Sequence, residues 1–184
     1  VVAFHDAEDM VHQAELAVFE AALAEADFVQ LPVRAEPLPG SRWVAGHYMD
    51  EFAEAHAKTM VVRDALGAAI PAAGVGFAVR REVLAELAGP FAADCLTEDY
   101  LFGVGLDRAG RQGRFLRLRD STGALVATRS CFPHQLDAAV RQKARWIEGI
   151  ACQSWDRVGW CGGLVNRWLL LRDRRATLVA MVLA

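Results

Sequence analysis

The sequence predicts an α/β fold, and two patterns lead to this prediction. Short apolar runs at residues 1–4, 28–33 and 77–79 have the length and composition of buried strands. Longer segments with apolar residues at helical spacing lie between and after these runs. The length of 184 residues and the hydrophobic content of 54% suit one folded domain, or slightly more than one, and exclude a disordered or collagen-like chain.

An amphipathic helix is expected soon after the first strand. Residues 1–4 end in a polar cluster at 5–9, and open α/β sheets place their ligands at such strand ends. The segment 13–26 then repeats apolar residues on one helical face, namely Leu16, Phe19, Leu23 and Ala26. The same spacing leaves the glutamates of this segment outside, at Glu15, Glu20 and Glu25.

The remaining elements follow from breaks in the hydrophobic pattern. The strand at 28–33 is ended by Pro32 and by the proline-rich loop at 37–40. Two alternating runs flank a turn at 121–123 and predict a hairpin. In chain order, the other expected elements are a helix at 43–66, a loop at 70–76, a strand at 77–79, helices at 82–87 and 98–107, hairpin strands at 115–119 and 125–129, and a long helical stretch from 133 to about 155.

Charge is distributed unevenly along the chain. The net charge is −3, which excludes a general nucleic-acid-binding protein. Residues 1–100 carry 6 basic and 17 acidic side chains, whereas residues 101–184 carry 14 basic and 6 acidic ones. Of the 20 basic residues, 18 are arginines, whose planar guanidinium suits phosphate groups; a GC-rich genome would produce the same bias.

The four cysteines lie far apart, at positions 95, 131, 152 and 161. No CxxC pair is present, so a structural zinc site is not expected, and sparse cysteines are typical of reduced, buried thiols. No signal peptide is recognisable, and the chain starts and ends within apolar runs. We therefore expect it to be part of a longer protein.

The last residues allow two interpretations. Arg172, Arg174 and Arg175 precede an apolar run of seven residues without a charge at 178–184. Basic residues beside an apolar segment are typical of the cytoplasmic end of a membrane helix, although about 20 apolar residues are needed to cross a bilayer. The alternative is a buried C-terminal helix with a solvated basic face, and the tail alone does not separate the two.

Three polar clusters are candidates for chemistry, and the first follows the first strand. His5, Asp6, Glu8 and Asp9 place three carboxylates close together. Carboxylates with this spacing can hold Mg²⁺ or Mn²⁺, with a diphosphate completing the coordination shell, and they favour these hard cations over zinc. The alternative is an acidic cluster that caps the helix at 13–26.

The second cluster, Thr97-Glu98-Asp99, stands at the start of an expected helix. Thr97 suits the N-cap position, and acidic residues are favourable near the positive end of a helix. In the other interpretation, Asp99 is a general base at the mouth of a pocket. Taken alone, the cluster is explained by the helix cap.

The third cluster lies on the long helical stretch. Gln142, Arg145 and Trp146 share one helical face because they are spaced at i, i+3 and i+4. Arginine can bind a diphosphate with two hydrogen bonds, and tryptophan can stack on the face of a sugar. The alternative is an ordinary amphipathic helix with a buried tryptophan and a solvated arginine.

Together, the order and spacing of the three clusters resemble the family 2 glycosyltransferases of the processive membrane type, such as cellulose and hyaluronan synthases. The second cluster follows the first by about 90 residues, and the third follows by about 45 more. The segment 74–84 resembles the glycine-containing acceptor segment of that family. Residues 5–9, Phe132-Pro133 and 141–146 are most similar to its bacteriophage-adsorption membrane glycosyltransferase subgroup.

This resemblance implies part of a nucleotide-diphospho-sugar transferase domain of the GT-A type, with a mixed sheet, helices on both faces and membrane-interface helices after them. Residues 1–132 would be the C-terminal, acceptor-side part of the catalytic domain, 133–176 the interfacial helices, and 177–184 the start of a transmembrane helix. The family's N-terminal half, which grips the nucleotide base, has no counterpart here. We therefore expect the 184-residue chain alone to bind nucleotide-sugars poorly.

The resemblance also implies roles for individual residues. Asp6 and Glu8 match the DxD position that holds Mg²⁺ or Mn²⁺ on the donor diphosphate; Glu8 replaces the usual second aspartate, and Asp9 is the alternative ligand. Asp99 matches the catalytic residue that deprotonates the acceptor hydroxyl. The residues implied to bind the donor diphosphate are Gln142 and Arg145, and those implied to bind the acceptor are Trp146, Gly74, Val75, Gly76, Phe77 and Glu98.

The implied activity is inverting transfer of a hexosyl group from a nucleotide-sugar, with a UDP-sugar expected, to a growing glycan or another acceptor. The implied location is the cytoplasmic face of a bacterial inner membrane, with membrane lipid as a partner and no nucleic acid. The alternative is a non-catalytic scaffold or surface-receptor component with the same fold. The intact Asp99 and the intact motif at 142–146 favour the enzyme.

Overall fold

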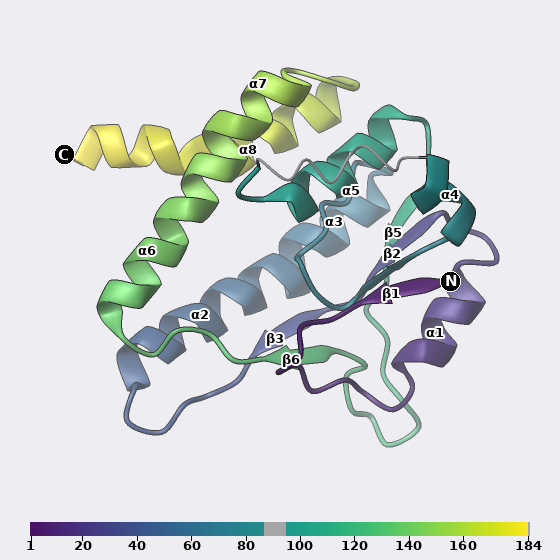
Figure 1. Ribbon diagram of the computed structural model, residues 1–184, viewed down its shortest axis with the longest axis horizontal. Coiled ribbons are helices and arrows are strands. Elements are labelled where there is room, and N and C mark those ends of the chain that lie inside the picture. Colours follow the sequence, from purple (N-terminus) through teal and green to yellow (C-terminus); the bar gives the residue numbers. More distant parts are fainter. Residues whose placement is uncertain (87–94, 184) are drawn as a thin grey trace.

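The computed structural model describes residues 1–86 and 95–183 of the chain (Figure 1). Short strands form two sheets, and helices pack around the larger one. In chain order the elements are β1 (Val2–Phe4), α1 (Glu15–Ala22), β2 (Phe28–Gln30), β3 (Val33–Ala35), α2 (Arg42–Glu54), η1 (Ala55–Thr59), α3 (Met60–Ala65), β4 (Phe77–Val79), α4 (Arg81–Glu86), α5 (Glu98–Arg108), β5 (Gly113–Phe115), β6 (Thr128–Ser130), α6 (Leu136–Ile147), η2 (Glu148–Gln153), α7 (Ser154–Val158) and α8 (Leu164–Leu183), where η1 and η2 are π-helical turns.

The larger sheet is mixed, as the resemblance implies. Its strand order is β1-β4-β2-β5; β4 runs antiparallel to both β1 and β2, and β5 runs parallel to β2. The smaller sheet pairs β3 with β6 in parallel. Because β1 and β4 are antiparallel, the end of β1 lies beside the start of β4. This edge of the sheet carries the first polar cluster and the glycine-containing loop.

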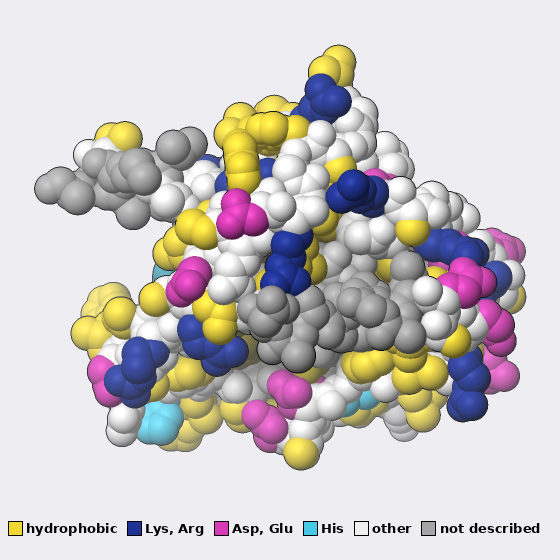
Figure 2. Space-filling model, turned by 45° about the horizontal axis from the view of Figure 1, so that its top comes forward, with side chains coloured by type: hydrophobic (Ala, Val, Ile, Leu, Met, Phe, Trp, Pro, Cys, Tyr) yellow, Lys and Arg dark blue, Asp and Glu magenta, His cyan; other side chains and the backbone are white. Residues whose placement is uncertain are grey.

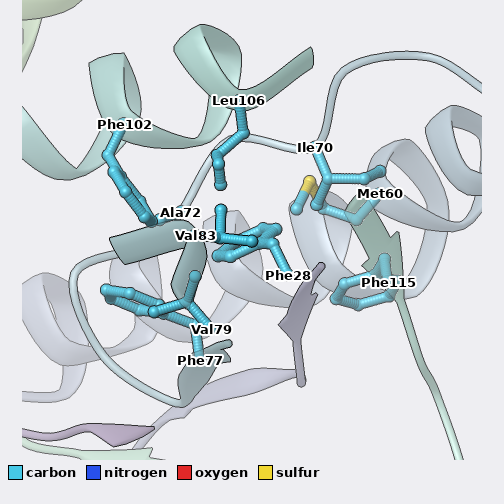
Figure 3. Close-up of a cluster of buried hydrophobic side chains, with 10 residues drawn as sticks. All are labelled: Phe28, Met60, Ile70, Ala72, Phe77, Val79, Val83, Phe102, Leu106 and Phe115. Carbon is cyan, nitrogen blue, oxygen red and sulfur yellow. The ribbon is translucent and has the colours of Figure 1, made fainter. Parts of the chain in front are cut away.

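Helices cover both faces of the larger sheet (Figure 1). On one face, Phe28, Phe77 and Val79 pack against side chains of α3, α4 and α5 (Figure 3). On the other face, Val29 and Ala78 pack against side chains of α1. Side chains alternate between the faces along each strand, so consecutive residues enter different clusters. Each fully buried large apolar side chain stabilises the fold by about 1.5–3 kcal/mol.

The helix expected at 13–26 forms as α1, and Phe19, Leu23 and Ala26 are buried as expected, but two neighbouring residues at the start of the helix differ from the prediction. Glu15, expected outside, is 0% exposed, whereas Leu16, expected in the apolar stripe, is 62% exposed. Glu15 is buried because Thr128 donates a hydrogen bond of 2.8 Å to its Oε1 and His5 lies 3.3 Å from the same atom. Polar partners from distant segments therefore reverse the expected burial at the start of the helix, while the rest of its apolar face is buried as predicted.

Two strand predictions were wrong because long-range pairing replaces local pairing. The run at 28–33 divides after Gln30, and its last residue joins β3 in the smaller sheet. The turn expected at 121–123 forms, and one antiparallel bridge between Arg119 and Leu125 encloses it, so the expected hairpin is reduced to the residues beside the turn. The segments on either side diverge, because β5 pairs in parallel with β2 and β6 pairs in parallel with β3.

The expected helices form with small shifts of their ends. The segment 43–66 becomes α2-η1-α3, and 98–107 becomes α5. The stretch from 133 to about 155 becomes a short extended segment followed by α6-η2-α7. The helix expected at 82–87 is α4, and its last expected residue, Leu87, lies outside the described residues.

The C-terminal helix α8 continues through the arginine cluster at 172–175 and across the expected boundary at 176. A buried ion pair attaches it to the domain, since the Asp173 carboxylate lies 2.5 Å from Nη2 of Arg63, which is 2% exposed. The hydroxyl of Tyr100 donates to the same carboxylate at 2.7 Å. Of the helices within residues 1–86 and 95–183, none is long and apolar enough to cross a membrane.

Candidate functional site

The candidate site lies at the edge of the larger sheet where β1 ends and β4 begins. The loop at 5–9 leaves β1, the loop at 73–76 enters β4, and Gly76 N donates a hydrogen bond of 3.0 Å to Phe4 O between them. The first turn of α5 places Asp99 against the second loop. The fold thereby brings together the first two polar clusters and the glycine-containing segment.

In the loop after β1, Asp6 and Glu8 are exposed while Asp9 turns inward. The Asp9 side chain is 0% exposed, and its Oδ2 accepts a hydrogen bond of 2.8 Å from Asp6 N. Asp9 N donates in turn to Asp6 O at 3.1 Å, so the two residues close a tight turn. Burial, followed by the neighbouring Asp9 and Glu8 carboxylates, raises the pKa of Asp6.

A polar network beneath this loop was not expected from the sequence. His5 lies between two carboxylates, with Nδ1 3.9 Å from Asp9 Oδ2 and Nε2 3.3 Å from Glu15 Oε1. Glu15 Oε1 also accepts the hydrogen bond from Thr128, the first residue of β6. The network therefore connects the loop after β1 to the smaller sheet.

Asp99 lies in the first turn of α5. Its Oδ1 accepts a hydrogen bond of 2.8 Å from Tyr100 N, and its Oδ2 lies 3.0 Å from the position that a Cβ would take at Gly74. Burial raises the pKa of Asp99 to about 6, and the charges of Glu98 and Asp6 act in the same direction. A carboxylate with this pKa can take up a proton near neutral pH.

The loop before β4 is shaped by two glycines in the left-handed region. Gly74 has φ of +82° and Gly76 has φ of +66°, which side chains with a Cβ rarely adopt. A Cβ at Gly76 would also lie 2.5 Å from Thr128 Oγ1. Val75 is buried, and Phe77 is 1% exposed within the core cluster. Of the four residues at 74–77 that were expected to bind the acceptor, Gly74 is the one left half-buried beside Asp99.

On α6, aromatic side chains of α2 hold Gln142 and Trp146. Tyr48 donates its hydroxyl proton to Gln142 Oε1 at 2.7 Å. Trp146 packs edge-on against Tyr48 and Phe52, with ring centres 6.1 and 6.3 Å apart. Arg145 is exposed, and no hydrogen bond or ion pair holds its guanidinium within the part of the chain that the structure describes.

Lys143 was not singled out by the sequence, yet it lies over two aromatic rings. Its Nζ is 4.6 Å from the ring centre of Tyr48 and 4.4 Å from that of Trp146. It also pairs with the carboxylate of Glu51 on α2. Burial lowers the pKa of Lys143 to about 8. The lysine therefore fastens α6 to α2 through cation–π contacts and an ion pair.

The α6-η2 segment also packs against the start of α5. Gly149 packs closely against Thr97. A Cβ added at position 149 would lie 2.6 Å from Cγ2 of Thr97. Gln153 Oε1 accepts a hydrogen bond of 2.8 Å from Leu96 N. Glu98, which follows Thr97, is exposed. The second and third clusters are thus carried by elements in contact, and π-helical turns such as η2 are common at functional sites.

A divalent cation fits the chemistry of the loop after β1. Asp6 and Glu8 are exposed, and a cation would relieve the carboxylate crowding that, with burial, raises the pKa of Asp6. Among the described residues, no group of three His, Cys, Asp or Glu side chains is placed to hold a metal by itself. Two carboxylates would leave the other positions of the shell to a diphosphate and to water.

Comparisons with known proteins agree with the motifs. The model of the family "Glycosyl transferase family group 2" matches residues 1–184. The chain is 34% identical over 195 residues to "Bacteriophage adsorption protein B" of Escherichia coli (strain K12), and equally to "Bacteriophage N4 adsorption protein B" of Escherichia coli O157:H7. The alignments cover 95% of this chain and 26% of each relative, so the chain spans about a quarter of their length. The chain therefore belongs to glycosyl transferase family group 2.

Proposed function

We propose that this chain is the acceptor-side part of an inverting glycosyltransferase, which moves a hexosyl group from a nucleotide-sugar to a glycan or another acceptor. The observation that carries the proposal is the position of Asp99. Its carboxylate lies against Gly74, has a pKa raised to about 6 by burial, and is close enough to Asp6 to be affected by its charge. Such a carboxylate is suited to act as a general base near neutral pH.

In the proposed reaction, Asp99 takes the proton of the acceptor hydroxyl as its oxygen attacks the anomeric carbon of the donor sugar. The bond between that carbon and the diphosphate oxygen breaks in the same displacement, so the configuration is inverted. Arg145 has no polar partner among the described residues and is available to the leaving nucleoside diphosphate. Gln142 keeps its amide N–H groups for the same diphosphate, because Tyr48 engages its carbonyl oxygen.

The acceptor would lie beside Gly74, with Trp146 and Glu98 at its edges. Trp146 is half-buried and retains exposed ring surface, and Glu98 is an exposed carboxylate at the start of α5. Sugars commonly stack on tryptophan through their apolar face and donate hydroxyl protons to carboxylates. The other residues of this segment would pack under the acceptor region and not contact the acceptor directly, because they are buried; they are Val75, Gly76 and Phe77.

Mg²⁺ or Mn²⁺ is the proposed cofactor. Asp6 and Glu8 would hold it, and when bound it supplies positive charge to the diphosphate of the donor. Asp9 closes the turn that presents these two side chains, because its buried carboxylate is bonded to Asp6 N. A UDP-sugar is the proposed donor.

The test is sugar transfer by the full-length, membrane-extracted protein, with a panel of UDP- and GDP-sugars and either Mg²⁺ or Mn²⁺. We expect activity with one donor that falls at least about 100-fold in Asp99→Asn, the size typical of losing a general base. Asp107→Asn, on the same helix, is the matched control and should stay within about twofold of the wild type. Near-normal transfer by Asp99→Asn would contradict the assigned base.

A second candidate function is suggested by the names of the relatives, which refer to bacteriophage adsorption. The chain would then belong to a non-catalytic scaffold or surface-receptor component with a glycosyltransferase-like fold. Phage adsorption to cells that carry Asp99→Asn separates the two candidates. Undiminished adsorption, together with a wild type that is folded but inactive with every donor, would favour the receptor.

We also propose that α2 and α6 contact membrane lipid at the cytoplasmic face. Trp43 is 87% exposed, and with Leu136, Val140 and Ile147 it borders an apolar groove of about 490 Å³ between the two helices. Figure 2 shows hydrophobic side chains beside Lys and Arg side chains at the left of the view, where these helices begin. Amphipathic surfaces with basic side chains bind anionic bilayers.

Vesicle flotation of the purified protein tests this contact. Attachment should weaken when anionic lipid is removed, and it should weaken further in Val140→Asp, which places a charge on the apolar face. Asp137→Ala, one turn away on the same helix, removes a negative charge and serves as the control that should not reduce attachment. Equal flotation with neutral and anionic vesicles would contradict the role of lipid charge.

A further inference from the structure

Gln30 is a buried amide at a position where the strand pattern favours an apolar residue. It is the last residue of β2, is 0% exposed, and points to the same face of the sheet as Phe28 of the core cluster. An amide is stable in such surroundings only when its hydrogen bonds are made. The partners of Gln30 therefore indicate what the amide is for.

The Gln30 side chain holds both ends of the loop that precedes β4. Its Nε2 lies 2.8 Å from Leu31 O, 2.9 Å from Val75 O and 3.0 Å from Gly76 O. Its Oε1 accepts a hydrogen bond of 2.9 Å from Ala73 N. One carboxamide thus serves as donor to the end of the loop and as acceptor from its beginning.

The residue between these attachment points touches the proposed base. Gly74 lies in the left-handed region, and a Cβ there would be 3.0 Å from Asp99 Oδ2. A loop with two glycines has many accessible backbone conformations, so its shape depends on the bonds that hold it. Gln30 supplies those hydrogen bonds from a buried position, and its own side chain is not exposed.

We infer that Gln30 is a positioning residue for the acceptor, an inference that rests on the proposed function. Its carboxamide sets the shape of the loop at 73–76, and the loop sets the space beside Asp99 through which the acceptor hydroxyl approaches. Glutamate in its place would direct carboxylate oxygens at the carbonyls of Val75 and Gly76. Methionine has nearly the same length but provides neither the donor nor the acceptor.

The kinetic test compares Gln30→Met and Gln30→Glu in the full-length protein with the control Val29→Ala. Val29 is 0% exposed in the same strand but faces the cluster on the other side of the sheet. We expect the Gln30 variants to lower the ratio of sugar transfer to donor hydrolysis at least about tenfold, with the donor KM within about twofold of wild type, because misplacement affects the acceptor alone. Val29→Ala should lower thermal stability and leave the ratio unchanged.

If Gln30→Met and Gln30→Glu change the ratio no more than Val29→Ala does, the inference is overturned. Gln30→Asn adds a graded comparison, because it keeps the amide but shortens its reach; its ratio should fall between those of the wild type and Gln30→Met. If Gln30→Asn lowers the transfer-to-hydrolysis ratio as much as Gln30→Met does, the amide is required at the reach that glutamine provides, which supports the inference. A wild-type ratio in Gln30→Met would contradict the inference.

Hydrogen–deuterium exchange provides a readout that needs no turnover. The Ala73 amide is bonded to Gln30 Oε1, so its exchange should be at least about tenfold faster in Gln30→Met, while the Ala78 amide in β4 stays protected. Unchanged exchange at Ala73 would overturn the inference whatever the activity. If the wild-type protein transfers sugar to no acceptor, the proposed function is overturned, and the loop at 73–76 then has no catalytic role. That result would leave the effect of Gln30 on the conformation of the loop unaffected.

Discussion

Gly74 and Asp99 are in direct contact: Asp99 Oδ2 lies 3.0 Å from the point at which a side chain at position 74 would begin. The backbone of Gly74 has φ of +82°, so glycine is favoured there for its conformation as well as for its lack of a Cβ. This contact joins the start of α5 to the loop before β4. A methyl group at position 74 would require the carboxylate of the proposed base to move by a few tenths of an ångström.

Gly74→Ala should therefore reduce activity more than stability. Gly40→Ala is a matched control, because Gly40 has φ of +81° but no atom lies within 4 Å of the position that a Cβ would take there. Both changes should cost about 1 kcal/mol of folding free energy through backbone strain. Only Gly74→Ala should lower the transfer rate, by about tenfold or more, because it displaces the Asp99 carboxylate. Equal activity in the two variants would show that the contact is not needed for transfer.

The transfer rate should rise with pH through about 6. Asp99 acts as a base only when deprotonated, and burial raises its pKa to about 6. The contribution of Asp99 should therefore make the transfer rate low at pH 5, half-maximal near the pKa of Asp99 and constant above about pH 7. Measurement of kcat/KM for the acceptor between pH 5 and 8 checks this. A rate that is already constant at pH 5 would exclude Asp99 as the titrating base.

Asp99→Asn should stabilise the fold at neutral pH although it lowers the transfer activity. The pKa of Asp99 is raised from 3.8 to about 6, so the folded state retains a proton that the unfolded state has lost between these values. Folding stability consequently falls as pH rises through this window. Removing the charge should recover about 1–3 kcal/mol at pH 7, and nothing below about pH 4. Urea unfolding of both proteins at the two pH values measures the difference.

Two glycines of α5 should respond in opposite ways to alanine. A Cβ at Gly103 would lie 2.5 Å from Ala72 N and 2.7 Å from the Cα of Pro71, whereas a Cβ at Gly105 would meet nothing within 4 Å. Gly103→Ala should lower the free energy of unfolding by about 1–3 kcal/mol, because the helix must move off the loop. Gly105→Ala should raise it by about 0.5–1 kcal/mol. Thermal unfolding of the pair tests how closely α5 approaches that loop.

The ion pair between Arg63 and Asp173 should dominate the attachment of α8. Arg63 is 2% exposed and also donates to Ala69 O at 3.0 Å, so Asp173→Asn leaves a buried cation without its counter-charge. We expect a loss of about 3 kcal/mol. Glu54→Gln, which breaks an exposed pair with Lys58, is the control and should change stability by less than about 1 kcal/mol. Similar effects in the two variants would contradict the structural role of the buried pair.

Several features of the fold could be predicted from the sequence because they depend on neighbouring residues. The strand at 77–79 and the helices at 43–66 and 98–107 form where hydrophobic spacing and the positions of proline and glycine predict them. The order of the polar clusters also indicated the family, since motif spacing is a property of the chain itself. Which side chains perform the chemistry remains a prediction that the experiments above address.

The course of the chain between the sheets was decided by tertiary structure. The run at 28–33 divides, and the expected hairpin opens beyond the bridge between Arg119 and Leu125, because β5 pairs with β2 and β6 pairs with β3. The pairing of these strands cannot be predicted from local residue patterns, because the paired strands are far apart in sequence.

The buried polar residues show most clearly which features could not be predicted from the sequence. By itself the sequence determined the α/β class, most helices and the motifs that mark the family. Only the tertiary structure decided that Glu15 would be buried, that Gln30 would hold the loop before β4, and that Asp99 would lie against Gly74. The physical reason is that burying a polar group is favourable only when its hydrogen bonds are made, and the partners of Glu15 and Gln30 come from segments that meet only in the folded chain. The approach of Asp99 to Gly74 likewise joins two segments that are far apart in sequence.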